Sequence, residues 1–120
     1  MSIKNIEIIK AIDSHIQWKK ELIETINSGE LQTPVDIIEK DTECEFGRWL
    51  LTYNNLADEK NTLKYNEIVL LHCEFHKIAG KIASLVISDK IKAAKKLMDV
   101  GGKYEILSAK LILALNNWDN

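Results

Sequence analysis

The chain has few of the residues that interrupt helices. It contains one proline and five glycines in 120 residues, together with two cysteines and 7% aromatic residues. This scarcity excludes collagen-like and loop-rich chains, and a content of 46% hydrophobic and 28% charged residues excludes a disordered one. The composition indicates a soluble helical protein, and a chain of this length builds one hydrophobic core. We therefore expect a single domain over residues 1–120.

The chain also lacks a strong charge of either sign and a long apolar run. Its formal net charge is −2 and its basic residues are scattered, which argues against a nucleic-acid partner. The most apolar stretches, 68–71 and 109–115, are shorter than the roughly 18 residues that a membrane span needs, so no membrane insertion is expected. The start "MSIKNIEIIK" has no secretion signal. We expect a cytoplasmic protein, in which Cys44 and Cys73 stay thiols.

Hydrophobic periodicity predicts an all-α fold, an antiparallel four-helix bundle of three long helices and one short one. The long helices are expected from Ile3 to about Asn27, from Asn61 or Thr62 to about Ile87, and from about Lys90 to Trp118. Gly29 is the expected cap of the first, and the pair Gly101 and Gly102 in the last marks a kink or a close helix contact.

Two shorter pieces are expected between the first and second long helices. One begins near Thr33 and Pro34. The other is the short helix of the bundle, which runs from Thr42 to about Tyr53, because "TECE" at 42–45 matches a capping box. This places Cys44 in the first turn of the short helix.

The stretch "HCEFH" at 72–76 holds two of the three histidines. His72 and His76 are four residues apart, so on a helix both imidazoles can reach one ion. Glu74 lies about 200° around the helix from His72 and cannot serve as the general base of a zinc protease. Cys73 diverges from His72 by about 100°, which makes a poor catalytic pair. We interpret Cys73 as a small hydrophobic residue.

His15 and Cys44 are the remaining candidates for a metal site. His15 lies beside Ile12 and Ile16, near the stripe that faces the core, where an imidazole must be paired or ligated. Cys44 at a helix start is close to free backbone N–H groups, which favour a thiolate. Taken alone, His15 would more often be a hydrogen-bonded residue at the core edge and Cys44 an inert thiol. Together with His72 and His76 they form a Cys-His₃ set suited to tetrahedral Zn²⁺.

Three blocks of the sequence, "HIQW" at 15–18, "CEFGRWL" at 44–50 and "HCEFH" at 72–76, resemble the signature of the chemoreceptor zinc-binding domain family. The resemblance covers about residues 10–115. This family is a bacterial four-helix-bundle module of cytoplasmic chemoreceptors and diguanylate cyclases that also occurs alone. The resemblance implies that zinc is held by His15, Cys44, His72 and His76. It also implies packing roles for Trp18, Phe46, Gly47, Trp49 and Leu50.

The resemblance further implies sensing of zinc, or of oxidants such as hypochlorous acid through the zinc-bound cysteine, in bacterial chemotaxis or cyclic-di-GMP signalling. No output module fits in 120 residues, so we expect a partner, either a second copy in a homodimer or a separate signalling protein. No enzymatic activity is expected, because protein groups fill all four positions around the metal.

Two other interpretations stay open at this point. A hemerythrin-like di-iron bundle would need about five histidines and bridging carboxylates, and the three histidines of this chain argue against it. A purely structural interaction bundle, in which the histidines and cysteines only pack, predicts that removal of zinc leaves stability unchanged.

Overall fold

A computed structural model of the chain describes residues 3–31, 33–40, 44–52 and 59–118. All regular structure in these ranges is helical, with no strand, which confirms the all-α prediction. The helices are α1 (Ile3–Ser28), α2 (Val35–Ile38), α3 (Glu45–Thr52), α4 (Glu59–Ile87), α5 (Ile91–Met98) and α6 (Lys103–Asn117). No helix of the described ranges is long and apolar enough to cross a membrane.

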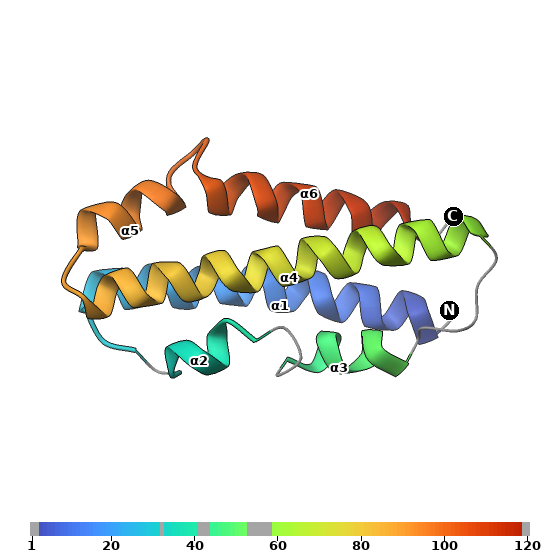
Figure 1. Cartoon of the computed structure of the whole chain (residues 1–120), viewed down its shortest axis with the longest axis horizontal. Helices are drawn as coiled ribbons and strands as arrows, with labels where there is room; N and C mark the ends of the chain where they lie inside the picture. The colour runs from blue at the N-terminus through green and yellow to red at the C-terminus, as the bar shows by residue number, and fades with distance from the viewer. Residues whose placement is uncertain (1–2, 32, 41–43, 53–58, 119–120) are drawn as a thin grey trace.

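The helices form an elongated bundle with four positions (Figure 1). The long helices α1 and α4 occupy two of them and run in the same direction, while α2 and α3 follow one another along the third position and α5 and α6 along the fourth. Both of these pairs run back against α1 and α4. The chain therefore alternates direction as expected for a four-helix bundle, with two of the four positions occupied by interrupted helices.

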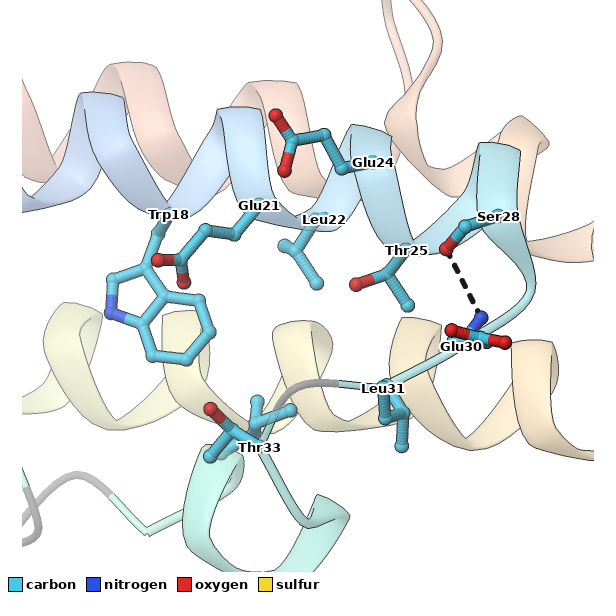
Figure 2. Close-up of a pocket in the computed structure, with 10 residues that line it drawn as sticks. Trp18, Glu21, Leu22, Glu24, Thr25, Ser28, Glu30, Leu31 and Thr33 are labelled. Atoms are coloured by element: carbon cyan, nitrogen blue, oxygen red, sulfur yellow. Dashed lines mark hydrogen bonds between the residues drawn. The ribbon is translucent and has the colours of Figure 1, made fainter.

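The first long helix ends at a glycine, as the sequence predicts. Gly29 has φ of 73°, in the left-handed region that favours glycine, and its N–H donates to the carbonyl of Thr25 at 2.8 Å. The next N–H, that of Glu30, donates to the Ser28 hydroxyl at 3.2 Å (Figure 2). These two bonds turn the chain away from α1 toward α2.

The prediction of one helix from Lys90 to Trp118 is wrong, because the glycine pair interrupts it. Asp99 is extended, with ψ of 161°, and Gly101 takes φ of 82°, so the helical bonds cannot continue. A Cβ built on Gly102 would lie 2.7 Å from the carbonyl oxygens of Leu97 and Lys96. The chain thus folds tightly over the end of α5 before α6 begins.

The core lies along the inner faces of α1, α4 and α6. Its largest fully buried side chains are Trp118, Tyr104, Phe75, Leu22, Ile68, Ile82, Leu111 and Leu115. The short helix α3 is anchored to this core near its C-terminal end, where the Tyr65 hydroxyl donates to the Leu50 carbonyl at 2.6 Å. Its N-terminal end, beside Cys44, faces the histidines of α4.

Candidate metal site

Two histidines of α4 face the interior. His72 and His76 are 4% and 3% exposed, and their Nε2 atoms are 3.1 Å apart. The i, i+4 spacing places them on one face, one turn apart. Cys73 is half-buried and Glu74 is exposed, and neither belongs to the group of donor atoms described below.

Cys44 occupies the N-cap position of α3. Its carbonyl accepts the Arg48 N–H at 3.1 Å, and its Sγ accepts the Gly47 N–H at 3.3 Å. The capping box predicted from the sequence, with Thr42 as N-cap, places Cys44 two positions further into the helix, in its first turn. Thr42 itself lies outside the described residues. An N-cap sulfur that receives a backbone N–H is stabilised as a thiolate, the form that binds metal. This Sγ lies 3.2 Å from the His72 Nε2.

The donor atoms of Cys44, His72 and His76 all lie within 4.8 Å of one another. In a tetrahedral zinc site, bond lengths of about 2.0–2.1 Å to nitrogen and 2.3 Å to sulfur give donor separations of about 3.3 Å for N···N and 3.6 Å for S···N. The N···N separation here is 3.1 Å and the S···N separation to His72 is 3.2 Å. The two pairs that involve His72 are therefore within a few tenths of an ångström of the zinc geometry, and the third pair, Cys44 and His76, lies within 4.8 Å.

His76 is oriented by a hydrogen bond on its far side. Its Nδ1 lies 2.8 Å from the carbonyl oxygen of Ile38, the last residue of α2. A carbonyl only accepts, so Nδ1 carries the proton and Nε2 presents its lone pair to the other donors. Among the described residues the Nδ1 of His72 has no such acceptor.

His15 lies beside this group without belonging to it. Its side chain is 6% exposed and its ring lies on Phe75, with the ring centroids 3.8 Å apart. Its ring nitrogens are not within 4.8 Å of all three donors. His15 nevertheless lines the same cavity as Cys44, His72 and His76, of about 90 Å³, and its buried Nε2 has no hydrogen-bond partner among the described residues. Such a nitrogen is costly to bury, and a bound metal would satisfy it.

Burial keeps two of the imidazoles neutral. Desolvation, reinforced by the charge of His76, lowers the pKa of His15 from 6.5 to about 4. Desolvation, followed by the charges of His76 and His15, lowers the pKa of His72 to about 3. At neutral pH both rings therefore keep a lone pair available to a cation.

Aromatic rings close the site. Phe46, which is 7% exposed, meets His72 edge-on at a centroid distance of 5.2 Å. Trp18 meets His76 in the same way at 6.4 Å, and it also lines a second cavity of about 200 Å³ between α1 and α2 (Figure 2).

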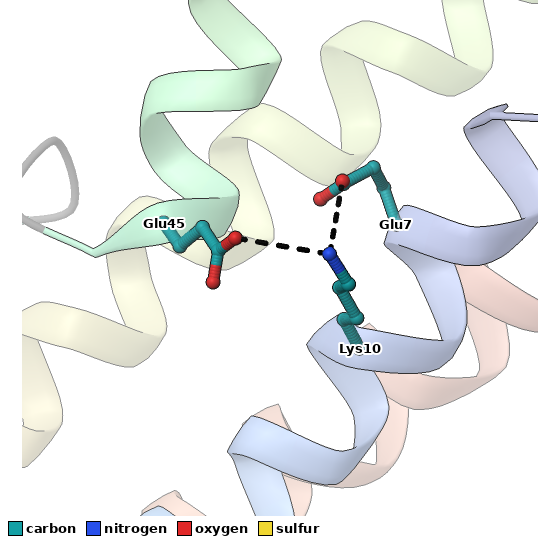
Figure 3. A network of polar contacts seen from close by, with 3 residues as sticks. All are labelled: Glu7, Lys10 and Glu45. Atoms are coloured by element: carbon teal, nitrogen blue, oxygen red, sulfur yellow. Dashed lines mark ion pairs between the residues drawn. The ribbon is translucent and has the colours of Figure 1, made fainter.

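On the outside of the site, the Lys10 Nζ of α1 lies 3.9 Å from a carboxylate oxygen of Glu45 and 3.7 Å from one of Glu7 (Figure 3). Both groups of the Lys10–Glu45 pair are exposed, so this link contributes little to stability.

No sequence pattern identifies the Ile38 carbonyl as a partner of His76, because every residue carries a carbonyl group. A weak sign exists in Gly80, a glycine inside a long helical stripe and one turn beyond His76. Glycine at such a position often indicates the close approach of another backbone.

A comparison with family models places the chain among known proteins. The model described as "Chemoreceptor zinc-binding domain" matches residues 15–83, a span that includes His15, Cys44, His72 and His76. The match confirms the resemblance drawn from the three sequence blocks. Neither the curated proteins nor the solved structures gave a match.

Proposed function

The chain belongs to the chemoreceptor zinc-binding domain family, and on this premise we propose that it is a regulatory zinc-binding domain that senses zinc availability, oxidants or both. The observation that carries the proposal is the convergence of the Cys44 Sγ with the Nε2 atoms of His72 and His76. Sulfur and neutral imidazole are the donors that zinc prefers.

His15 completes the proposed ligand set as the fourth donor. Its buried and unpartnered Nε2, on the wall of the cavity that the other three donors share, supports this assignment. With four protein ligands the ion keeps no open position for a substrate, so the proposed role is regulatory and not enzymatic.

Cys44 is the proposed sensing residue. Bound zinc would hold its sulfur as a thiolate, and Cys44 is half-buried, whereas the three histidines are buried. Hypochlorous acid oxidises a thiolate by two electrons: sulfur gains the oxygen as sulfenic acid and chloride leaves. The product is a weaker ligand than the thiolate, so the bond between α3 and the ion would be lost.

The output of the sensor passes to another chain, by this proposal. Release of the N-terminal end of α3 changes the packing beside His72, and a partner protein recognises the altered conformation. The partner is a second copy of the chain or a cytoplasmic signalling protein of bacterial chemotaxis or cyclic-di-GMP signalling, as is implied by the family.

Metal content tests the zinc site. The purified protein is expected to hold one zinc per chain, and Cys44→Ser is expected to weaken zinc binding, while the matched control Cys73→Ser leaves it unchanged. Two irons per chain, or equal losses in the two cysteine variants, would contradict the site.

A separate experiment tests the oxidant response. The zinc-loaded protein is treated with stoichiometric hypochlorous acid, and released zinc is followed with a chromogenic chelator. We expect release from the native protein and from Cys73→Ser. If the native protein retains its zinc, Cys44 is not an oxidant sensor, although the zinc site itself would stand.

A further inference from the structure

Helix α4 and the end of α2 approach each other closely at one glycine. A Cβ built on Gly80 would lie 2.6 Å from the Cβ of Glu39 and 3.2 Å from its Cα. Cβ and Cα are held by the backbone and cannot swing aside as the tip of a long side chain can. Any side chain at position 80 would therefore push the segment around Glu39 away from α4.

The same segment supplies the carbonyl that orients His76. Ile38 immediately precedes Glu39, and its oxygen lies 2.8 Å from the His76 Nδ1. His76 and Gly80 are four residues apart in α4, so they lie on one face of the helix, one turn from each other. Ile38 and Glu39, at the end of α2, thus lie against two successive turns of α4, those of His76 and Gly80.

The carbonyl of Ile38 is available because α2 ends there. The final carbonyls of a helix have no partner within it, and α2 is only four residues long. The backbone bonds at this end go to other carbonyls: the N–H of Glu39 donates to Val35 and that of Lys40 to Ile37. The oxygen of Ile38 is left for His76.

We infer that Gly80 is a positioning residue of the metal site: by admitting the Ile38–Glu39 segment against α4, it places the Ile38 carbonyl on the His76 Nδ1–H and aims the His76 Nε2 at the ion. This inference rests on the proposed zinc site for its effect on affinity. The positioning of His76 itself is a property of the chain with or without metal. Groups that orient a ligating imidazole typically change metal affinity about 10- to 100-fold when they are lost.

Gly80→Ala is the direct test. Alanine is the better helix former, so a glycine without a positioning role would gain stability from this change and keep its zinc affinity. We expect zinc affinity, measured by competition with a chelator, to fall about 10-fold or more. The matched control is Ser84→Ala, which places alanine at an exposed position one turn further along α4 and is expected to leave affinity unchanged.

Removing the opposing Cβ should reverse the loss. Glu39 is exposed, so Glu39→Gly alone is expected to bind zinc as the native protein does. In the double variant Gly80→Ala with Glu39→Gly, the contact at 2.6 Å no longer exists, and only the longer contacts to the Cα and N of residue 39, at 3.2 and 3.4 Å, remain. We expect this variant to recover most of the lost affinity, which damage elsewhere in the fold would not allow.

Nitrogen NMR of the histidine rings gives a readout that does not depend on affinity. In the native protein, with and without zinc, His76 should carry its proton on Nδ1, and with zinc it should bind metal through Nε2. In metal-free Gly80→Ala, we expect the Nδ1–H signal to lose the shift caused by the Ile38 carbonyl.

Several results would overturn the inference: metal bound to His76 through Nδ1 in the native protein, an unchanged His76 signal in Gly80→Ala, or no recovery in the double variant. If Gly80→Ala does not fold, the native spectra and the double variant still decide the matter. A native protein that binds no zinc but shows the expected Nδ1–H signals would refute the zinc site and leave the positioning of His76 intact.

Discussion

Acid should destabilise the metal-free protein steeply, because two buried imidazoles must be neutral in the folded state. The pKa of His15 falls from 6.5 to about 4 on folding and that of His72 to about 3. At pH values between the unfolded pKa of 6.5 and the folded pKa of each ring, the unfolded chain binds more protons than the folded one, so stability rises with pH. The stabilising contribution is complete above pH 6.5 and is lost as the pH falls toward the folded pKa of each ring.

The size of the effect follows from linkage. From about pH 7.5 to about pH 5, each imidazole lowers the free energy of unfolding by about 2 kcal/mol, and the two together by about 4 kcal/mol. Both side chains are less than a tenth exposed, so solvent screening does not reduce these values. A domain at the lower end of the typical stability range of about 5–15 kcal/mol would come close to unfolding at the lower pH.

Urea unfolding of the chelator-treated protein at the two pH values measures this loss. His15→Gln removes one of the two titrating rings, so its pH-dependent loss should be about half that of the native protein, whatever its absolute stability. A native loss below about 1 kcal/mol, or an equal loss in the variant, would refute the argument that these rings are buried in the neutral form.

Three substitutions test the contacts that hold the short elements. Tyr65→Phe should lower the free energy of unfolding by about 1 kcal/mol, because the Leu50 carbonyl loses its donor; an unchanged urea midpoint would contradict this bond. Lys10→Met should change stability by about 0.5 kcal/mol or less, since its pair with Glu45 is exposed. A larger loss in the same assay would show that the pair is a true tether of α3. Gly102→Ala should cost about 1–3 kcal/mol in thermal unfolding, because its Cβ meets backbone oxygens, and a neutral result would mean that the turn before α6 relaxes freely.

The sequence predicted the parts of the site that local periodicity controls. The i, i+4 spacing of His72 and His76 was enough to place both rings on one face of α4, and the hydrophobic stripe was enough to predict that His15 is buried. How far His15 lies from the other donors depends on the packing of α1 against α4, a tertiary property that no spacing within one helix expresses.

The misplaced element has a local cause. The apolar stripe continues through Gly101 and Gly102, since α5 and α6 face the same core, and the period alone therefore predicted one helix. The positive φ of Gly101 and the close contact of Gly102 are backbone features, which a hydrophobic pattern does not record. The same holds for the Ile38 carbonyl, whose role depends on where α2 ends.

The helices that carry the four proposed ligands differ in length, which supports the proposal that the cysteine is the responding ligand. His72 and His76 belong to a helix of 29 residues and His15 to one of 26, whereas Cys44 precedes a helix of eight. The far end of α3 is anchored through Leu50 and Tyr65, and the contacts near Cys44 include the exposed ion pair of Glu45 and the packing of Phe46 on His72. In the proposed sensor, loss of the sulfur ligand would loosen one end of a short helix while the long helices keep their core, so a signal would form without unfolding the domain.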